Sequence, residues 1–338
     1  MKVLIINQSE VHQLLPMDAC IDLMSNTLKT LASGDAINPL RRGMLLPEQA
    51  GLLAMMPGYM GNIHAMGLKA ISIVPSNQGS QYDSHMGAVL LFETKHGSIQ
   101  AIIDASSITA IRTAAVSGVA TRLLAHEDAS DLTIMGSAVQ AHTHLQAMLL
   151  VRKIKRVRVW SRTYENARTF AERESKRHGI TVEAVQDAQQ AVKAADIICT
   201  TTAAEEPILY GKWIAAGAHI NAVGSSIPFA RELDTAAVVN AKLFVDRCES
   251  ALNEAGDFLI PKKEGVINDD HIKGEIGEIL LGQVTGRTSP NEITLFKSLG
   301  LAVEDIASAH HIYNKALELG VGSWVEFGGS HYTLLDTN

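Results

Sequence analysis

The chain is poor in cysteine, in long apolar runs and in positive charge. Its 338 residues include three cysteines, Cys20, Cys199 and Cys248, and no two of them form a Cys-x-x-Cys pair. An odd number of widely spaced cysteines argues against a disulfide framework or a zinc knuckle and is typical of a reducing compartment, so we expect a cytoplasmic protein. Because no stretch of about 20 apolar residues occurs, we expect no membrane span, and the short apolar run after Met1 does not suit a secretion signal.

The shortage of positive charge limits the possible partners. Lys and Arg total 29 against 36 Asp and Glu, which gives a formal net charge of -7. This balance argues against nucleic acid as a partner, because a surface that binds phosphates along a nucleic acid is basic. It is compatible with a small anionic ligand, since a pocket can be locally cationic inside an acidic protein.

Motifs of metal-dependent and nucleophilic enzymes are missing as well. The sequence contains no His-Glu-x-x-His, Walker A or Gly-x-Ser-x-Gly motif, so zinc protease, P-loop and serine hydrolase chemistry is not indicated. Two histidine pairs, His142 with His144 and His310 with His311, are too close along predicted helices to face one side. We interpret these histidines as structural or surface residues and predict no bound metal.

Hydrophobic patterning separates a central region from the two ends of the chain. Residues 44–103 contain short apolar runs separated by Gly, Pro, Asn and Ser, which predicts a mostly antiparallel sheet. From about residue 131, short apolar strands alternate with helices, as in a parallel sheet that helices cover on both faces. This alternation ends near residue 302, and a long helix over 301–320 and a short strand follow it.

These patterns predict an α/β protein of two domains, which the length of the chain also favours. A Rossmann-type, doubly wound parallel sheet over residues 123–302 is inserted into a discontinuous α+β domain. Residues 1–122 and 303–338 form that second domain together, since they flank the region of regular alternation on both sides.

A glycine-containing turn in the central region is a candidate dinucleotide site. The residues Gly136-Ser137-Ala138-Val139-Gln140 follow the apolar strand DLTIM and open a helix. Gly136 suits the tight turn, Ala138 stands where a second glycine normally lets the pyrophosphate approach, and the helix N-terminus supplies free N–H groups. The short motif alone fits an ordinary strand-to-helix turn equally well, but the surrounding strand–helix–strand pattern favours the cofactor.

The end of the next strand indicates which dinucleotide is bound. The strand RVRVW leads into Ser161-Arg162-Thr163, and the first carboxylate is Glu165. NAD-binding domains usually place Asp or Glu here, on the ribose 2′-hydroxyl, whereas a guanidinium pairs bidentately with a 2′-phosphate. We therefore predict NADPH in preference to NADH; the alternative is that Arg162 is a solvated loop residue.

Several segments together resemble the ornithine cyclodeaminase/mu-crystallin family along nearly the whole chain. They are GLKAISIVP (67–75), ITAIRTAAVSG (108–118), GSAVQA (136–141), VWSRTYENA (159–167), EEPIL (205–209), GAHINAVGSS (217–226), RELD (231–234) and FKSLGLAVED (296–305). The resemblance implies a homodimer whose catalytic domain is built from both chain ends around an inserted Rossmann domain. It also implies an enzyme, because members include cyclodeaminases, alanine dehydrogenase-like enzymes and reductases of cyclic ketimines.

The resemblance extends both predicted sites. On and beside the matching segments, the cofactor site gains Thr113, Thr201, Val223, Gly224, Ser225 and Gly300. Three cations match the family's carboxylate-binding positions, namely Arg41, Lys69 and Arg112, and His85 is a further candidate for contact with the substrate. Lys69 and Arg112 lie inside apolar runs, where a charge must leave the core or meet an anion.

Each cation also has a simpler reading. A lone Lys or Arg is usually a solvated surface residue, and Arg42 would replace Arg41 after a shift of one residue. We favour the anion site because three cations match together.

Two departures from the family pattern distinguish reduction from deamination. Where the deaminating members carry Asp two residues after NAVG, this chain has Ser226, which follows Ser225. Where cyclodeaminases carry Glu ahead of Met-Pro, it has Ala54 in LLAMMPG. Deamination needs a base for ammonium and water, whereas reduction of a ready-made imine needs only a hydride and a proton. Both departures therefore disfavour ornithine cyclodeaminase.

The predicted function is NADPH-dependent reduction of a cyclic ketimine that carries a carboxylate. The reaction converts Δ1-pyrroline-2-carboxylate to L-proline, or Δ1-piperideine-2-carboxylate to L-pipecolate. Lys69, Arg112 and Ser226 are the predicted catalytic residues: Arg112 binds the carboxylate, and Lys69 or a water that it orients keeps the imine nitrogen protonated. The alternatives are an ornithine cyclodeaminase or amino-acid dehydrogenase of the same family, and a crystallin-like NADPH-binding protein without catalysis.

Overall fold

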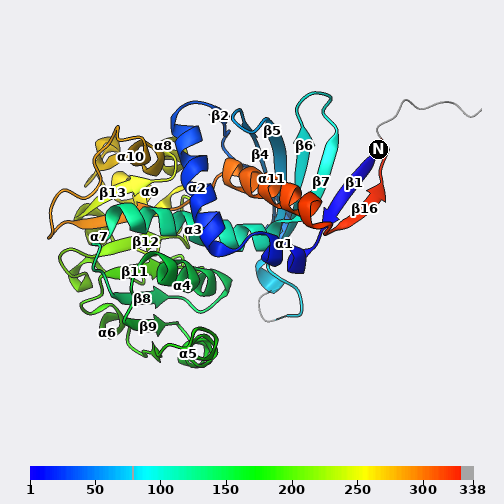
Figure 1. Cartoon of the computed structure of the whole chain (residues 1–338). Helices are drawn as coiled ribbons and strands as arrows, with labels where there is room; N and C mark the ends of the chain where they lie inside the picture. The colour runs from blue at the N-terminus through cyan, green and yellow to red at the C-terminus, as the bar shows by residue number, and fades with distance from the viewer. Residues whose placement is uncertain (78–79, 329–338) are drawn as a thin grey trace, which may run out of the picture.

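The computed structural model describes residues 1–77 and 80–328, which form two eight-stranded sheets with helices packed between and around them (Figure 1). The first sheet has the order β16-β1-β7-β6-β5-β4-β2, and β3 pairs with β4. Its strands come from both ends of the chain, as expected for a discontinuous unit: β1 (Lys2–Ile6), β2 (Ala36–Ile37), β3 (Arg42–Leu45), β4 (Leu52–Met60), β5 (Ala65–Ile73), β6 (His85–Glu93), β7 (Ile99–Asp104) and β16 (Ser323–Glu326).

The predicted antiparallel pairing is confirmed for β3 to β7. β1 pairs parallel with β7, so the first sheet is mixed. Along β5, buried residues alternate with half-buried ones, and Lys69 falls in the buried set with Gly67 and Ile71. Because side chains of a strand alternate between its two faces, this register carries the Lys69 side chain to the core face.

The second sheet is entirely parallel and confirms the predicted Rossmann-type winding. Its order is β10-β9-β8-β11-β12-β15-β13-β14. The chain order reverses between β8 and β11, which makes the carboxyl ends of these two strands the expected ligand-binding edge. The strands are β8 (Asp131–Met135), β9 (Arg156–Trp160), β10 (Val182–Ala184), β11 (Ile197–Thr200), β12 (His219–Ala222), β13 (Ala241–Val245), β14 (Ile272–Glu275) and β15 (Ile293–Lys297).

Helix α3 connects the two sheets. It is buried over most of its length and contacts β5 and β6 on one side and β12 and β15 on the other, and Figure 1 shows it crossing between them. One hydrophobic cluster runs from β1 and α2 through α3 to β8 and β9. The helices are α1 (Gln8–Leu14), α2 (Met17–Ala32), α3 (Ala105–Leu124), α4 (Val139–Val151), α5 (Tyr164–His178), α6 (Ala188–Val192), α7 (Thr235–Val239), α8 (Cys248–Glu254), α9 (Gly256–Lys263), α10 (Ile276–Leu280) and α11 (Ala302–Leu319).

Patterning does not predict the elements between β13 and β15. Helices α8, α9 and α10 are short, α9 contains Pro261, and β14 contains Gly274 at φ +155. Such short and interrupted segments show neither a helical nor a strand period, although β14 adds an outer strand to the second sheet. In the part of the chain that the structure describes, no helix is both long and apolar enough to cross a membrane.

Candidate active site

The turn after β8 has the geometry that a dinucleotide site requires. Gly136 has φ +129, and a Cβ there would lie 2.5 Å from Thr201 Oγ1, so only glycine fits. The Gly136 N–H donates to Trp160 O at 2.8 Å, and the Thr201 N–H donates to Met135 O at 2.8 Å. Gly136 and Thr201 therefore meet at the point where the strand order reverses.

Helix α4 begins at this turn with uncapped backbone N–H groups. Ala138 is its N-cap residue and no side chain of the described residues caps it, while Val139 is 61% exposed. The first N–H groups of a helix have no partner within the helix and can bind a phosphate. The Ser137 hydroxyl donates to the Ser161 hydroxyl at 3.0 Å, and the Gln140 amide donates to Thr109 O on α3 at 3.4 Å. The turn and helix therefore fit the pyrophosphate of a dinucleotide.

Arg162 and Thr163 are exposed at the end of β9. Glu165, the first acidic residue after them, pairs with Arg168 at 3.2 Å. Within residues 1–77 and 80–328, Arg162 makes no ion pair. Its guanidinium is therefore available to an anionic group near Ser161.

The loop after β12 is held largely by its own hydrogen bonds. Ser225 is buried, and its hydroxyl donates to Ala230 O. The Gly224 N–H donates to Glu232 Oε2 at 2.8 Å. Ser226 is half-buried. The Ser225 hydroxyl is thus engaged within the loop, and we expect Val223 and Gly224 to meet a ligand through main-chain atoms.

A buried group of charges lies where β5, α3 and α11 meet. The Lys69 Nζ lies 2.7 Å from Asp305 Oδ2 and 3.5 Å from the Thr109 hydroxyl. Both side chains of the ion pair are almost inaccessible to water. Burial lowers the pKa of Lys69 to about 8, against the opposing effect of Asp305. Lys69 is therefore a cation that releases its proton more readily than an exposed lysine.

Arg112 shares the same carboxylate. Its Nε donates to Asp305 Oδ1 at 3.0 Å, and its Nη1 donates to Glu304 Oε2 at 2.7 Å. Burial raises the pKa of Glu304 to about 7, although the charge of Arg112 opposes this rise. Among the described residues, Nη2 of Arg112 has no hydrogen-bond partner. The predicted pair of cations is therefore brought together, with one guanidinium nitrogen left for a ligand.

Gly300 allows Arg112 to occupy this position. Gly300 has φ +79, and a Cβ there would lie 2.5 Å from Arg112 Nη1. Asp246, at the end of β13, accepts from the N–H groups of Leu299 and Gly300 at 2.6 and 2.8 Å. The turn before α11 is therefore fixed by Asp246 from the second sheet. Thr113, next to Arg112 on α3, is also buried.

Arg41, and not Arg42, is turned toward this cluster. Arg41 Nη2 donates to Leu299 O at 2.8 Å and lies 2.7 Å from Glu254 Oε2. Arg42 is exposed at the start of β3. His85 is exposed at the start of β6, and its pKa is lowered by desolvation and by the nearby charge of Lys69. The structure thus places Arg41 and His85 near the two buried cations.

The site predicted from the sequence does not include the acidic partners of these cations. Glu304 and Asp305 lie in the matching segment FKSLGLAVED, and this match could have identified them as site residues. Asp246 and Glu254 fall outside every matching segment. These carboxylates balance Arg41, Lys69 and Arg112 before a ligand binds. The arrangement can hold one small anion beside a group that carries a proton.

His142 also has neighbours that patterning does not predict. Its Nδ1 lies 2.8 Å from Glu174 Oε2, and His178 Nε2 lies 3.4 Å from the same oxygen. The three residues form a group that could hold a metal. The sequence analysis does not detect this group, because it considers His142 only together with His144. Arg173 Nε already pairs with Glu174 Oε1 at 2.6 Å, so we interpret the group as packing between α4 and α5.

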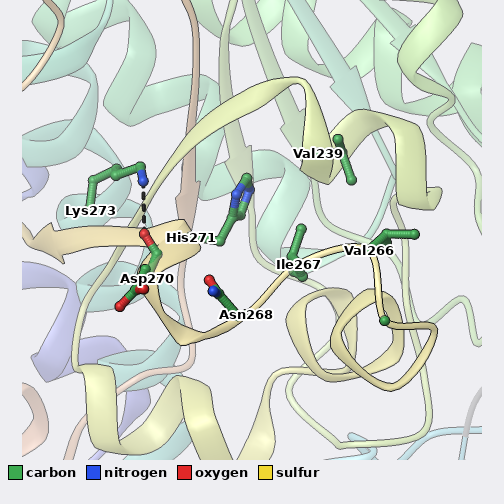
Figure 2. Close-up of a pocket in the computed structure, with 8 residues that line it drawn as sticks. Val239, Val266, Ile267, Asn268, Asp270, His271 and Lys273 are labelled. Atoms are coloured by element: carbon green, nitrogen blue, oxygen red, sulfur yellow. Dashed lines mark hydrogen bonds between the residues drawn. The ribbon is translucent and has the colours of Figure 1, made fainter.

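A separate open hollow of about 400 Å³ lies beside β14 (Figure 2). His271 Nε2 bonds to Val238 O at 2.8 Å, and Lys273 Nζ donates to Asp270 O at 2.7 Å, the contact that Figure 2 marks. The side chains of His271 and Lys273 are therefore engaged by main-chain oxygens. None of the residues that line the hollow belongs to the predicted sites, so we locate the candidate site at the carboxyl ends of β8 and β11 and not here.

Known proteins are similar to this chain in sequence and fold. The Δ1-pyrroline-2-carboxylate reductase of Bacillus cereus is 37% identical over 326 residues, which cover 96% of this chain and 100% of the relative. The structure of Thermococcus litoralis Δ1-pyrroline-2-carboxylate reductase in complex with NADH and L-proline superposes with a TM-score of 0.93 at 41% identity, covering 95% of this chain and 99% of that one. An archaeal alanine dehydrogenase dimer with bound NAD has a TM-score of 0.92 at 31% identity, covering 97% and 100%.

A family model matches most of the chain. The model of the ornithine cyclodeaminase/mu-crystallin family matches residues 1–320. This range contains every segment on which the sequence resemblance rests, and it includes both predicted sites. The chain belongs to the ornithine cyclodeaminase/mu-crystallin family.

Proposed function

We propose that this chain reduces cyclic ketimine carboxylates with a nicotinamide cofactor. The substrate is Δ1-pyrroline-2-carboxylate, which yields L-proline, with Δ1-piperideine-2-carboxylate as the six-membered alternative. The observation that carries the proposal is the buried pair of cations, Lys69 and Arg112, held on one carboxylate of Asp305. The relatives named as Δ1-pyrroline-2-carboxylate reductases, one of them solved with L-proline, support the substrate class.

Arg112 is the proposed anchor of the substrate carboxylate. Its planar guanidinium can bind a carboxylate through two nitrogens, and its Nη1 is occupied by Glu304 at 2.7 Å. Because burial raises the pKa of Glu304 to about 7, this acid can take up a proton near neutral pH. Protonation would remove the negative charge that competes for Nη1, and an incoming carboxylate could then bind Nη1 and Nη2 together.

Lys69 is the proposed residue that keeps the imine nitrogen protonated. With a pKa lowered to about 8, it is mostly protonated at neutral pH and can share that proton with an imine nitrogen from Nζ. A protonated imine is the more electrophilic form. When bound, the reduced nicotinamide supplies the hydride. Asp305 keeps Lys69 and Arg112 in place during the reaction, and Arg41 adds a third positive charge.

Two positions support reduction over deamination. Ala54 is buried on β4 opposite Ile71 of β5, so no carboxylate extends from this position toward Lys69. Ser226 offers a hydroxyl and not the carboxylate that deamination would use as a base. We therefore propose an imine reductase, and not an ornithine cyclodeaminase or an amino-acid dehydrogenase.

We propose NADPH as the preferred cofactor. The exposed Arg162, with the hydroxyls of Ser161 and Thr163 on either side of it, supports this preference, because a guanidinium pairs strongly with a phosphate. A site for NADH would place a carboxylate here to bind the ribose hydroxyls. Glu165, the nearest acid in the sequence, is instead paired with Arg168.

We also propose a homodimer that buries the outer part of the first sheet. Exposed apolar side chains on β2 to β4 support this interface: Ile37, Met44, Leu45 and Met55 are between 38% and 74% exposed. Apolar groups in such number on neighbouring strands indicate a protein contact. The archaeal alanine dehydrogenase with the same fold is described as a dimer.

We also propose a domain division and a cellular compartment. We place a substrate-binding and dimerisation domain at residues 1–122 and 303–338, and the nucleotide domain at 123–302; the two separate sheets support this division. Cys20, Cys199 and Cys248 are unpaired, which supports a reducing compartment such as the cytoplasm.

Steady-state assays test the function directly. The two cyclic imino acids, ornithine and alanine should be offered with each nicotinamide dinucleotide, and turnover read at the nicotinamide absorbance. We expect oxidation of NADPH with the imino acids and no release of ammonia from ornithine. Comparable rates of ornithine deamination, or binding of NADPH without turnover of either imine, would contradict the proposal.

A further inference from the structure

Glu232 is a fully buried carboxylate at the ligand-binding edge of the second sheet. Its Oε1 accepts from the N–H and the hydroxyl of Thr202 at 2.6 and 2.7 Å. Its Oε2 accepts from the Thr200 hydroxyl at 2.7 Å and from the Gly224 N–H at 2.8 Å. Because a backbone N–H can only donate, each oxygen must act as an acceptor, which suits the ionised form.

These hydrogen bonds join the end of β11 to the loop after β12. A side chain at Gly224 would not fit between them, since a Cβ there would lie 2.0 Å from Thr202 O and 2.5 Å from Glu232 Oε1. The two segments therefore meet main chain to main chain, with the Glu232 carboxylate as the link. Thr201 and Val223, both predicted to contact the cofactor, lie directly beside the linked residues.

Asp257 in turn fixes the main chain at Glu232 through hydrogen bonds. Asp257 Oδ1, on α9, accepts from the N–H groups of Glu232 and Leu233 at 2.9 and 3.0 Å. The other Asp257 oxygen lies 3.0 Å from Lys297 Nζ. Lys297 ends β15 and pairs in register with Ala222 of β12. A chain of buried charges thus connects α9 to the ends of β11, β12 and β15.

We propose that Glu232 is a positioning residue for cofactor binding, which fixes the relative placement of the loops that carry Thr201 and Val223. The inference rests on the proposed nicotinamide site. Glu232 acts on both dinucleotides alike, because the group that distinguishes NADPH from NADH lies at the end of β9, near Arg162. Its loss should therefore weaken NADPH and NADH by the same factor.

A purely structural role would give a different result. If Glu232 only stabilised the fold, its substitution would lower the melting temperature and leave the cofactor dissociation constant of the folded enzyme unchanged. Glu292 provides a matched control, since it accepts from the Thr288 N–H at 2.8 Å and the Thr288 hydroxyl at 3.1 Å. It stands just before β15, at the opposite edge of the sheet.

The experiment measures dissociation constants for NADPH and NADH by nicotinamide fluorescence, with melting temperatures, on the full-length enzyme and on Glu232→Gln and Glu292→Gln. The glutamine amide must present an N–H group to one pair of donors, so at least one hydrogen bond is lost and replaced by repulsion. We expect Glu232→Gln to weaken both dinucleotides about tenfold or more, and Glu292→Gln to change only the melting temperature.

Two further variants decide the matter if Glu232→Gln does not fold. Thr202→Ala removes one hydroxyl from Glu232 Oε1, and Thr202→Ser restores it, so we expect weaker binding of both dinucleotides in the first and normal binding in the second. Wild-type affinity in a folded Glu232→Gln or in Thr202→Ala would overturn the inference, as would equal weakening in Glu292→Gln. Because binding is measured without substrate, a wild-type enzyme that binds NADPH but reduces no imine would contradict the proposed function and not this inference.

Discussion

Lys69 on β5 and Asp305 on α11 form a buried ion pair, with Lys69 Nζ and Asp305 Oδ2 2.7 Å apart. The second oxygen of Asp305 accepts from Arg112 Nε at 3.0 Å. One carboxylate from the C-terminal helix therefore fixes two cations that come from a strand and a helix near the other end of the chain. Removing this carboxylate would leave two buried positive charges close together.

We expect Asp305→Asn to be strongly destabilising. Breaking a buried ion pair by removing one partner typically costs about 3–5 kcal/mol, because the remaining charge is left uncompensated. Asp22→Asn is the matched control, since Asp22 pairs with Arg122 at 2.8 Å on the exposed surface, where a pair contributes about 1 kcal/mol or less. Urea unfolding of both variants measures the difference. A loss of stability in Asp305→Asn no greater than in Asp22→Asn would contradict the central role of Asp305.

The sequence predicts the two cations better than it predicts their partners. Lys69 and Arg112 lie within apolar runs, so their burial and their need for an anion follow from elementary electrostatics. Glu304 and Asp305 lie in a helix of ordinary amphipathic pattern, where acidic residues in the first turn have a local explanation as partners of the helix dipole. Only the tertiary fold, which brings α11 against α3 and β5, shows that both acids are buried.

The fold shows the same division between local and long-range information. Strand–helix alternation predicts the second sheet from β8 to β13, because apolar strands and helical segments follow one another regularly there. Between β13 and β15 the regular alternation is interrupted, with Pro261 inside α9 and Gly274 inside β14. Glu232 shows why patterning also misses positioning residues. It belongs to the matching segment RELD, yet its four hydrogen bonds depend on strand ends that are distant in sequence.

Activity should fall on the alkaline side with a midpoint set by Lys69. Its pKa is lowered from 10.5 to about 8, so the side chain loses its proton as the pH rises through about 8. If this proton assists imine reduction, kcat/KM is highest below that pH and declines above it. Lys69→Arg keeps the positive charge at all these pH values, so the decline should move to higher pH even if the maximum rate is lower.

The measurement is kcat/KM for Δ1-pyrroline-2-carboxylate across the pH range at saturating cofactor. Lys29→Arg, the same type of change at a residue of α2 outside both proposed sites, is the control and should leave the profile unchanged. An alkaline decline at the same pH in Lys69→Arg as in the wild type would assign the titration to another group, such as the imine itself.

Arg162 should determine the choice of dinucleotide. Arg162→Ala removes a charge-assisted contact to the 2′-phosphate, which contributes roughly 1.5–3 kcal/mol, or about ten- to a hundredfold in NADPH binding. NADH binding should change little, and Arg162→Asp should shift the preference toward NADH. Arg177→Ala, at an exposed arginine in the last turn of α5, is the control. Michaelis constants for both dinucleotides decide the question: unchanged NADPH values in Arg162→Ala would leave the preference without this explanation.

Gly300→Ala should impair substrate binding more than its backbone strain explains. Gly300 and Gly320 both have positive φ, at +79 and +65, but a Cβ at Gly300 would lie 2.5 Å from Arg112 Nη1. In the described part of the chain, no atom lies within 4 Å of a Cβ at Gly320. Alanine in the left-handed region costs roughly 1–2 kcal/mol at either position. Only at Gly300 must the guanidinium also move, so Gly300→Ala should raise the KM for the imino acid and Gly320→Ala should not. Steady-state kinetics and melting temperatures of the two variants separate these effects. Equal KM values in folded Gly300→Ala and Gly320→Ala would show that Arg112 does not bind the substrate carboxylate from the position that the structure gives it.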